Sequence, residues 1–170
     1  MRRPALAGLC LGLWLVAGCR IEDHTPTGSR RDEAAVLALV SRYERTFSSR
    51  DWNGARALFW ADAIYSGPML LREGSTHQAV PIELALGTIA RRVEGFDPAR
   101  FGVRVLRSDY RQDGELAAVW LTTRRLTPVA GSVSDDEWIE HLVLRRIKGE
   151  WRILSLAATA SPGSETRGSR

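Results

Sequence analysis

The chain has 170 residues, with 24 basic and 20 acidic side chains and a formal net charge of +4. The arginines occur in dispersed pairs such as Arg124-Arg125, a distribution typical of solvated faces, which argues against a nucleic-acid-binding surface. The two cysteines, Cys10 and Cys19, both lie near the amino terminus, so a disulfide framework and thiol catalysis are excluded for the rest of the chain.

Residues 1–18 have the pattern of a bacterial lipoprotein signal peptide. A pair of arginines is followed by an apolar run over residues 6–16, and two small residues precede Cys19 in a sequence that resembles the lipobox. The run is shorter than the roughly 20 residues that span a bilayer. We expect cleavage before Cys19 and lipid on its sulfur, which anchors the protein in the cell envelope. Arg20 stands where inner-membrane lipoproteins commonly have aspartate, which favours the outer membrane, facing the periplasm, in a Gram-negative organism. An ordinary signal peptide with a chance cysteine is the alternative.

Polar and turn-forming residues at both ends of the remaining chain predict segments without regular structure. We expect residues 19–31 to form a flexible, lipidated tether and residues 161–170 to form a disordered tail. Residues 32–160 have about the length of one domain with its own core.

The spacing of apolar residues predicts helices in the first half of this domain. The first helix covers residues 32–49, with Asp32 as its N-cap, and a short second helix is capped by Asp51. The apolar stripe of the first helix consists of Val36, Val40, Tyr43 and Phe47.

Strand-like sequence separates the second helix from a third. Residues 63–66 are expected to form a strand that ends at Gly67-Pro68, and residues 69–78 a second extended piece interrupted by a turn. Pro81 suits the first position of the third helix. The apolar stripe of that helix consists of Ile82, Leu86, Ile89 and Val93.

The second half of the domain predicts long strands joined by turns. Asp113-Gly114 and Gly149 mark two of the turns, and residues 128–135 are expected to form a flexible loop. Helices followed by an antiparallel meander predict an α+β domain, in which a curved antiparallel sheet wraps around about three helices. The expected strands cover residues 101–111, 115–126, 136–148 and 150–159.

The order and spacing of several short stretches resemble the nuclear transport factor 2-like superfamily. The stretches are Val40-Ser-Arg-Tyr43, Arg50-Asp51-Trp52, Ala57-Leu58-Phe59, Asp62-Ala63 with Tyr65, His141-Leu-Val-Leu-Arg-Arg and Gly149-Glu-Trp151-Arg-Ile153. The SnoaL-like and ketosteroid-isomerase-like branches match best. The resemblance implies a cystatin-like cone with a tapered pocket, often dimeric through the outer face of its sheet. Members include isomerases, dehydratases, cyclases and domains that only bind, so the fold does not determine the function.

The resemblance also assigns roles to three positions. Tyr43 matches the tyrosine that donates a hydrogen bond to the substrate oxygen in ketosteroid isomerases. Their carboxylate base falls at Gly67, which has no side chain to accept a proton. Their protonated aspartate falls near Glu140, with His141 beside it. Because the base is missing, we expect no ketosteroid isomerase activity.

Six side chains are candidates for the pocket. Side chains alternate along a strand, so Glu140 and His141 point to opposite faces and only one of them can enter the pocket. Glu140 inside an apolar cone could donate a hydrogen bond, whereas the favoured alternative is a charge on the sheet surface. For the aromatic residues the alternative is an ordinary core position. The six are Tyr43, Trp60, Tyr65, Trp120, Glu140 and His141.

No cofactor or metal site is predicted. His77 and His141 lie far apart in the sequence, and neither belongs to a ligand pair such as His-x-His. A glycine-rich phosphate loop and a nucleophile elbow are also missing from the sequence.

Three functions are compatible with these patterns. The leading hypothesis is a non-catalytic envelope lipoprotein whose cone binds a small hydrophobic ligand or a protein partner. The second is an enzyme in which Tyr43 and Glu140 donate hydrogen bonds to an oxyanion, with Asp109 or His141 as the acid or base. The third is a dimeric assembly module, with Trp138 or Trp120 on the outer face of the sheet.

Overall fold

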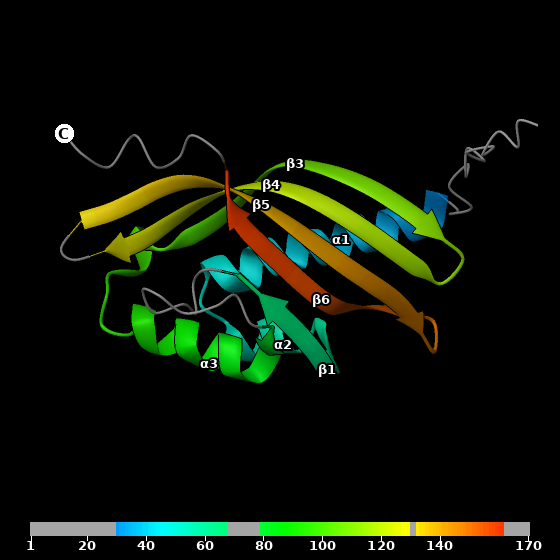
Figure 1. Cartoon of the computed structure of the whole chain (residues 1–170), viewed down its shortest axis with the longest axis horizontal. Coiled ribbons are helices and arrows are strands. Elements are labelled where there is room, and N and C mark those ends of the chain that lie inside the picture. The colour runs from blue at the N-terminus through cyan, green and yellow to red at the C-terminus, as the bar shows by residue number, and fades with distance from the viewer. Residues whose placement is uncertain (1–29, 68–78, 130–131, 162–170) are drawn as a thin grey trace, which may run out of the picture.

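The computed structural model of the chain describes residues 30–67, 79–129 and 132–161. These residues form an α+β cone in which the helices pack against one face of a single curved sheet (Figure 1). The helices are α1 (Arg30–Ser48), α2 (Trp52–Arg56), α3 (Ile82–Val93) and the short 3-10 helix η2 (Pro98–Arg100). The strands are β1 (Phe59–Ser66), β2 (Val80–Pro81), β3 (Gly102–Asp113), β4 (Leu116–Val129), β5 (Ser132–Ile147) and β6 (Glu150–Ala160).

The sheet has the strand order β2-β1-β6-β5-β4-β3 and is mixed rather than wholly antiparallel. Its four long strands, β3 to β6, form the expected antiparallel meander. The first strand, β1, pairs with β6 in parallel. The two strands are far apart in the sequence, and the intervening helix and meander supply the long crossover that a parallel pair needs.

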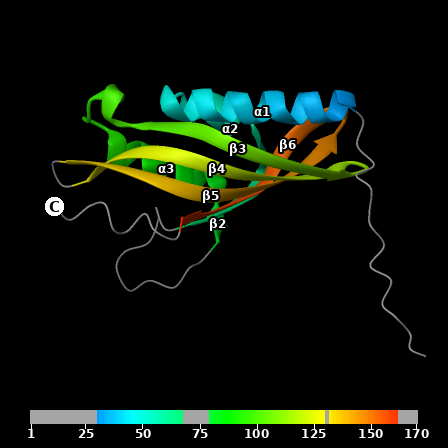
Figure 2. The ribbon, with the colours of Figure 1, turned by 90° about the horizontal axis from the view of Figure 1, so that it is seen from above.

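The helices cover the inner face of the sheet, and α1 runs along it (Figure 2). The apolar stripe predicted for the first helix is buried in α1, and the stripe predicted for the third is buried in α3. Both stripes belong to one core with the inward side chains of the strands. Burial of these stripes stabilises the helices more than their intrinsic propensity does.

Helix ends and loops differ in detail from the expectations. Asp51 caps α2 as predicted, since its carboxylate accepts a hydrogen bond of 2.8 Å from the Gly54 amide. Asp32 is not an N-cap, because α1 begins at Arg30. Its carboxylate instead forms an ion pair of 2.7 Å with Arg146 on β5, which fixes the first turn of α1 to the sheet.

The strands are longer than the sequence predicted. The first begins at Phe59, and the expected loop over residues 128–135 is mostly strand, because β4 and β5 extend toward each other. Turn glycines have the positive φ angles that such turns need, at +57° for Gly114 and +85° for Gly149. Pro81 precedes α3 as its N-cap residue rather than occupying the first helical position.

Several expectations fall outside the described residues. These are the signal peptide, the lipidation site at Cys19, most of the tether, the extended piece over residues 69–78, and the tail after residue 161. In the described part of the chain, no helix is both long and apolar enough to cross a membrane.

Candidate functional site

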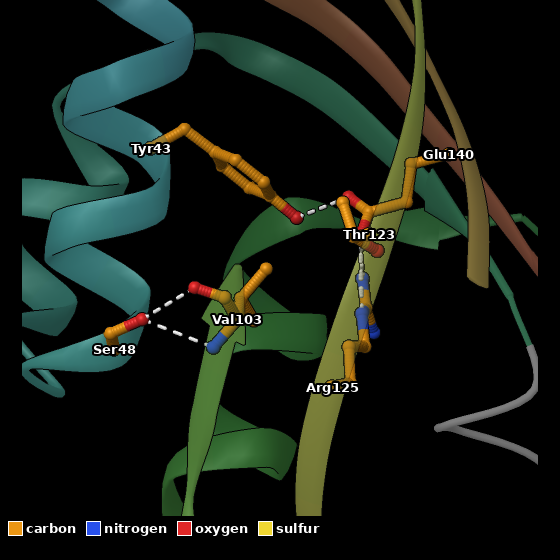
Figure 3. A network of polar contacts seen from close by, with 6 residues as sticks. All are labelled: Tyr43, Ser48, Val103, Thr123, Arg125 and Glu140. Carbon is orange, nitrogen blue, oxygen red and sulfur yellow. Dashed lines mark hydrogen bonds and ion pairs between the residues drawn. The ribbon is translucent and has the colours of Figure 1, made fainter. Parts of the chain in front are cut away.

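A buried polar cluster inside the cone is centred on the carboxylate of Glu140 (Figure 3). The Tyr43 hydroxyl, on α1, donates a hydrogen bond of 2.6 Å to Oε2 of Glu140. The Thr123 hydroxyl, on β4, donates one of 2.6 Å to Oε1. Arg125, also on β4, donates to the same Oε1 through Nε at 3.1 Å and Nη2 at 2.9 Å. The carboxylate therefore accepts hydrogen bonds from three side chains.

Strand register brings these side chains together. Leu121 on β4 is paired with Glu140 on β5. Thr123 and Arg125 follow at intervals of two residues, so they lie on the same inward face. Tyr43 reaches this face from the buried stripe of α1. Residues that are 97 positions apart in the chain thus meet in one hydrogen bond.

Burial and charge set the protonation of the cluster. Burial raises the pKa of Tyr43 well above its usual value, and the charge of Glu140 raises it further, so the phenol keeps its proton and donates. Burial has the largest single effect on the pKa of Arg125 and lowers it, but the charge interactions with Glu140, Tyr43 and Tyr65 and the hydrogen bond to Glu140 together raise the pKa above its ordinary value. The charged guanidinium also packs over the ring of Trp138, 4.9 Å from its centroid. In these hydrogen bonds Glu140 accepts from Tyr43, Thr123 and Arg125.

Two sequence interpretations are wrong at this cluster. Glu140 was a pocket candidate, and the favoured alternative, a charge on the sheet surface, is wrong because none of its surface is exposed. The Arg124-Arg125 pair was assigned to a solvated face, which holds only for Arg124, whose guanidinium pairs with exposed Asp135 at 2.6 Å. Arg125 is 4% exposed. Alternation along β4 was the available signal, because inward Leu121 and Thr123 share their parity with Arg125.

Tyr65 fills the position at which the resemblance places a catalytic base. A Cβ atom at buried Gly67 would lie only 2.5 Å from the Tyr65 hydroxyl and 3.2 Å from the carbonyl oxygen of Ala158. A carboxylate side chain at position 67 would therefore require the phenol to move. The Tyr65 hydroxyl donates no hydrogen bond in the described part of the chain. Burial raises its pKa, although the Arg125 guanidinium lies near enough to lower the pKa of this phenol in part, so the phenol remains protonated.

An apolar cavity lies next to this phenol, between α3 and the sheet. Its solvent-accessible volume is about 10 Å³, which is room for about one water molecule. The polar side chains in its wall are Tyr65, Arg125 and Thr127. The other lining residues are Phe47, Ile82, Ala85, Leu86, Ile89, Phe101, Gly102, Val103 and Leu156.

The other three candidates lie away from the cavity. Trp120 is 50% exposed and stacks on His141, with ring centroids 4.2 Å apart and an angle of 25° between the rings. His141 has the opposite parity to Glu140 and lies on the outer face of the sheet. Trp60, on β1, is 36% exposed. The structure thus brings Tyr43, Tyr65 and Glu140 into the interior and leaves these three side chains outside.

The cluster is poorly arranged for the proposed oxyanion chemistry. The Tyr43 hydroxyl is already donated to Glu140, and Glu140 itself accepts. Asp109 is exposed on β3 and pairs with Arg107 at 3.1 Å, remote from the cavity lining. Among the described residues, no group of three histidine, cysteine or acidic side chains is placed to hold a metal ion.

Comparison with known proteins identifies the fold. No family model matches the chain, and no curated protein sequence does. The chain is similar to an NTF2-like protein of unknown function from Pseudomonas putida KT2440, with a TM-score of 0.63 at 15% identity, covering 84% of this chain and 95% of that one. It is similar to an NTF2-like protein with a cystatin-like fold from Novosphingobium aromaticivorans, with a TM-score of 0.58 at 16% identity, covering 78% and 84%. A ketosteroid isomerase-like protein from Erwinia carotovora atroseptica matches with a TM-score of 0.59 at 21% identity, covering 79% and 100%. At these identities the likeness shows the α+β cystatin-like fold that the sequence predicted, and leaves the activity open.

Proposed function

We propose that this protein is a lipid-anchored, non-catalytic binding domain of the bacterial cell envelope, and that it binds a second copy of itself through the outer face of its sheet. The observation that carries the proposal is the contrast between the two faces. The inner face is filled, with a fully occupied carboxylate and a cavity of about 10 Å³. The outer face carries apolar side chains that the described helices do not cover.

The outer patch is a set of mostly apolar side chains on β5, its neighbour β4, and β1, which is separated from β5 by β6. Register places Trp120 beside His141 on one row of the sheet, and Val143 beside Ala118 on the next. Ile64, which is 46% exposed, extends the second row through Ser155 on β6. Contiguous apolar patches of this kind mark interaction surfaces more often than scattered apolar residues do. The outer patch consists of Ile64, Ala118, Trp120, Ile139, His141 and Val143.

We favour a second copy of this protein as the partner, because no surface other than the outer patch itself is then required. In a twofold dimer the same patch meets itself, so apolar surface on one protein is covered by equivalent apolar surface on the other. The resemblance to a superfamily that often dimerises through this face supports the same arrangement. A small hydrophobic ligand, in contrast, needs a larger cavity than the closed interior offers.

The lipid anchor is supported by the amino-terminal sequence. The apolar run, the small residues before Cys19 and the arginine pair are those of a lipoprotein signal. Ten residues lie between Cys19 and Arg30, where α1 starts, so eleven residue-to-residue steps join them. At roughly 3.3 to 3.6 Å per residue, they span at most about 40 Å. The domain would therefore stay close to the membrane surface.

Sedimentation velocity tests the association. A Cys19→Ser chain, which carries no lipid, should sediment as a dimer at micromolar concentration. Trp120→Ala in that chain should weaken the dimer at least about tenfold, because a central aromatic side chain carries much of the energy of an interface. Leu84→Ala is the matched control, since Leu84 is 53% exposed on α3, outside the outer patch. A monomer at all concentrations would contradict the proposed partner.

Lipid labelling tests the anchor separately. The wild-type chain should incorporate radioactive palmitate in bacterial cells and fractionate with membranes. Cys19→Ser should abolish the label and release the domain from the membrane fraction. A label that persists in this variant would refute the anchor without affecting the association.

A further inference from the structure

A second concave region lies on the surface of the protein, between α1 and the start of β6. Its solvent-accessible volume is about 350 Å³, against about 10 Å³ for the cavity inside the cone. Pockets that bind small molecules usually have volumes of roughly 300 to 1,000 Å³. We call this region the α1–β6 groove. Its walls include Leu39, Arg42, Leu58, Glu150, Trp151 and Arg152.

The groove is open because a neighbouring strand begins late and small side chains stand opposite. β1 pairs with β6 only from Ile153 onward, so residues 150–152 have no strand on that side in the described part of the chain. On α1, the exposed residues Ala35 and Ala38 line the gap. Their methyl groups are too short to fill it. Because a helix and a strand hold the two sides, the groove is preformed.

The charged residues that line the groove leave one positive charge in excess. Glu150 and Arg152 form an ion pair of 3.1 Å, so their charges largely offset each other. Arg42 is exposed on α1 and forms no ion pair within the described residues. No acidic residue stands three or four positions from it in the sequence, where a helical neighbour could offset its charge. Arg42 therefore remains available to an anion.

The remainder of the wall is largely apolar and held in place by the core. Leu39, Leu58 and Trp151 belong to the hydrophobic core, and each also borders the groove. Core side chains are closely packed, so this part of the wall keeps its shape. An apolar group placed in the groove would remove apolar surface from water without a rearrangement of the core.

We propose that the α1–β6 groove binds a small amphipathic organic anion, whose acid group pairs with Arg42 and whose apolar body packs on Leu39 and Trp151. A guanidinium suits this role because its planar fork matches the oxygens of carboxylate and phosphate groups. The groove shares no lining residue with the outer patch or with the cavity inside the cone. Binding here therefore does not depend on association with a second copy.

Titration of the Cys19→Ser chain with 8-anilinonaphthalene-1-sulfonate tests the site. The sulfonate of this fluorophore is a tetrahedral oxyanion, as phosphate is, and its ring system is apolar. Arg42→Gln should weaken binding about fivefold, the upper end of what an exposed ion pair contributes. Arg45→Gln is the matched control, because Arg45 is also an exposed arginine of α1 but does not line the groove. Its affinity should equal that of the unsubstituted Cys19→Ser chain.

The uncharged analogue N-phenyl-1-naphthylamine separates the charge of the groove from its apolar wall. It has the same rings without the sulfonate, so Arg42→Gln should leave its affinity unchanged. Higher ionic strength should weaken binding of the sulfonate and not that of the analogue. Glu150→Gln should tighten binding of the sulfonate about twofold, because Arg152 then loses its ion pair.

A variant that fills the groove tests its location. Ala38→Phe places a ring in the space and should weaken binding of both fluorophores at least about tenfold. Ala34→Phe is the matched control, since Ala34 is also an exposed alanine of α1 but does not line the groove. Binding to this variant should be unchanged.

Several outcomes would overturn the proposal. Equal affinities of the unsubstituted chain and Arg42→Gln for the sulfonate would show that Arg42 does not bind the anion. Unchanged binding to Ala38→Phe, or binding that is lost in Trp120→Ala, would place the fluorophores outside the groove. Altered sedimentation of Ala38→Phe would assign the groove to contact with a second copy. A chain that is monomeric throughout would refute the proposed partner and leave the result at the groove unaffected.

Discussion

The two faces of the sheet reverse the usual distribution of polarity. On the inner face, Glu140 and Arg125 carry opposite charges and are 0% and 4% exposed. On the outer face, Trp120 is 50% exposed beside His141. Glu140 and His141 are consecutive residues, so a single step along β5 separates a buried ion pair from a surface stack. The comparison teaches that position on the strand, not residue type, decides which side chains form the interior.

The largest effect is expected from a variant that breaks the buried ion pair between Arg125 and Glu140. Arg125→Met leaves the Glu140 charge buried without its cation and should lower the free energy of unfolding by about 3 to 5 kcal/mol. Equilibrium denaturation in urea measures this change. The double variant Arg125→Met with Glu140→Met should recover most of the loss, because no unpaired charge remains. A double variant no more stable than the single one would contradict this account.

A smaller effect is expected from the bond between α1 and the sheet. Tyr43→Phe removes a donor to a charged acceptor and should lower the free energy of unfolding by about 1.5 to 3 kcal/mol. Tyr110→Phe is the control, because the Tyr110 hydroxyl bonds to Gln112 in a part-buried setting. Urea denaturation of the two variants should therefore separate them clearly, and equal losses would argue against a special role for Glu140.

Substitution of Tyr65, the second interior tyrosine, is expected to leave the free energy of unfolding unchanged or to raise it. Tyr65→Phe removes a buried hydroxyl that donates no hydrogen bond within the described residues. A buried donor without a partner is destabilising, so the variant should be as stable as the wild type or more stable by about 1 kcal/mol. Thermal and urea unfolding measure the change. A loss similar to that of Tyr43→Phe would reveal a hydrogen bond to this hydroxyl.

The smallest expected effect on stability comes from His141 on the outer face, and it depends on pH. Partial burial lowers the pKa of His141, so the folded protein favours the neutral ring. Protonation therefore opposes folding, and stability should fall slightly as the pH drops below about 6.5, the ordinary histidine value, through the lower folded pKa. His141→Phe should remove this part of the pH dependence in urea denaturation between pH 7.5 and 5. The same slope in wild type and variant would assign it to other groups.

The elements with regular patterns were predictable from sequence. The stripes of α1 and α3, the Asp51 cap and the turns at Gly114 and Gly149 follow from local spacing and turn chemistry. The parallel pairing of β1 with β6 was not predicted, because strand pairing depends on distant segments. The ion pair of Asp32 was not predicted either, because its partner Arg146 lies 114 residues away in the chain. Local sequence alone suggested a helix cap.

The candidate site was predicted only in part. Tyr43 and Glu140 were identified through the resemblance, and alternation showed that only one of Glu140 and His141 could lie inside. Thr123 and Arg125 were missed. Arg125 was passed over because an arginine next to another arginine usually belongs to a solvated face. The role of Tyr65 was also missed, since its phenol occupies the space beside Gly67 only in the folded chain.

The sequence by itself determined the α+β class, the helical stripes and the absence of a base at position 67, because periodicity and residue type are local properties. The tertiary structure decided which side of β5 is inside, that Arg125 forms an ion pair with Glu140, and that Ser48 and Arg50 bind the backbone of Val103 and Phe96. Those outcomes depend on strand register and on contacts between residues far apart in the chain. Burial of these contacts shifts the pKa values of the groups involved and holds their side chains in one arrangement.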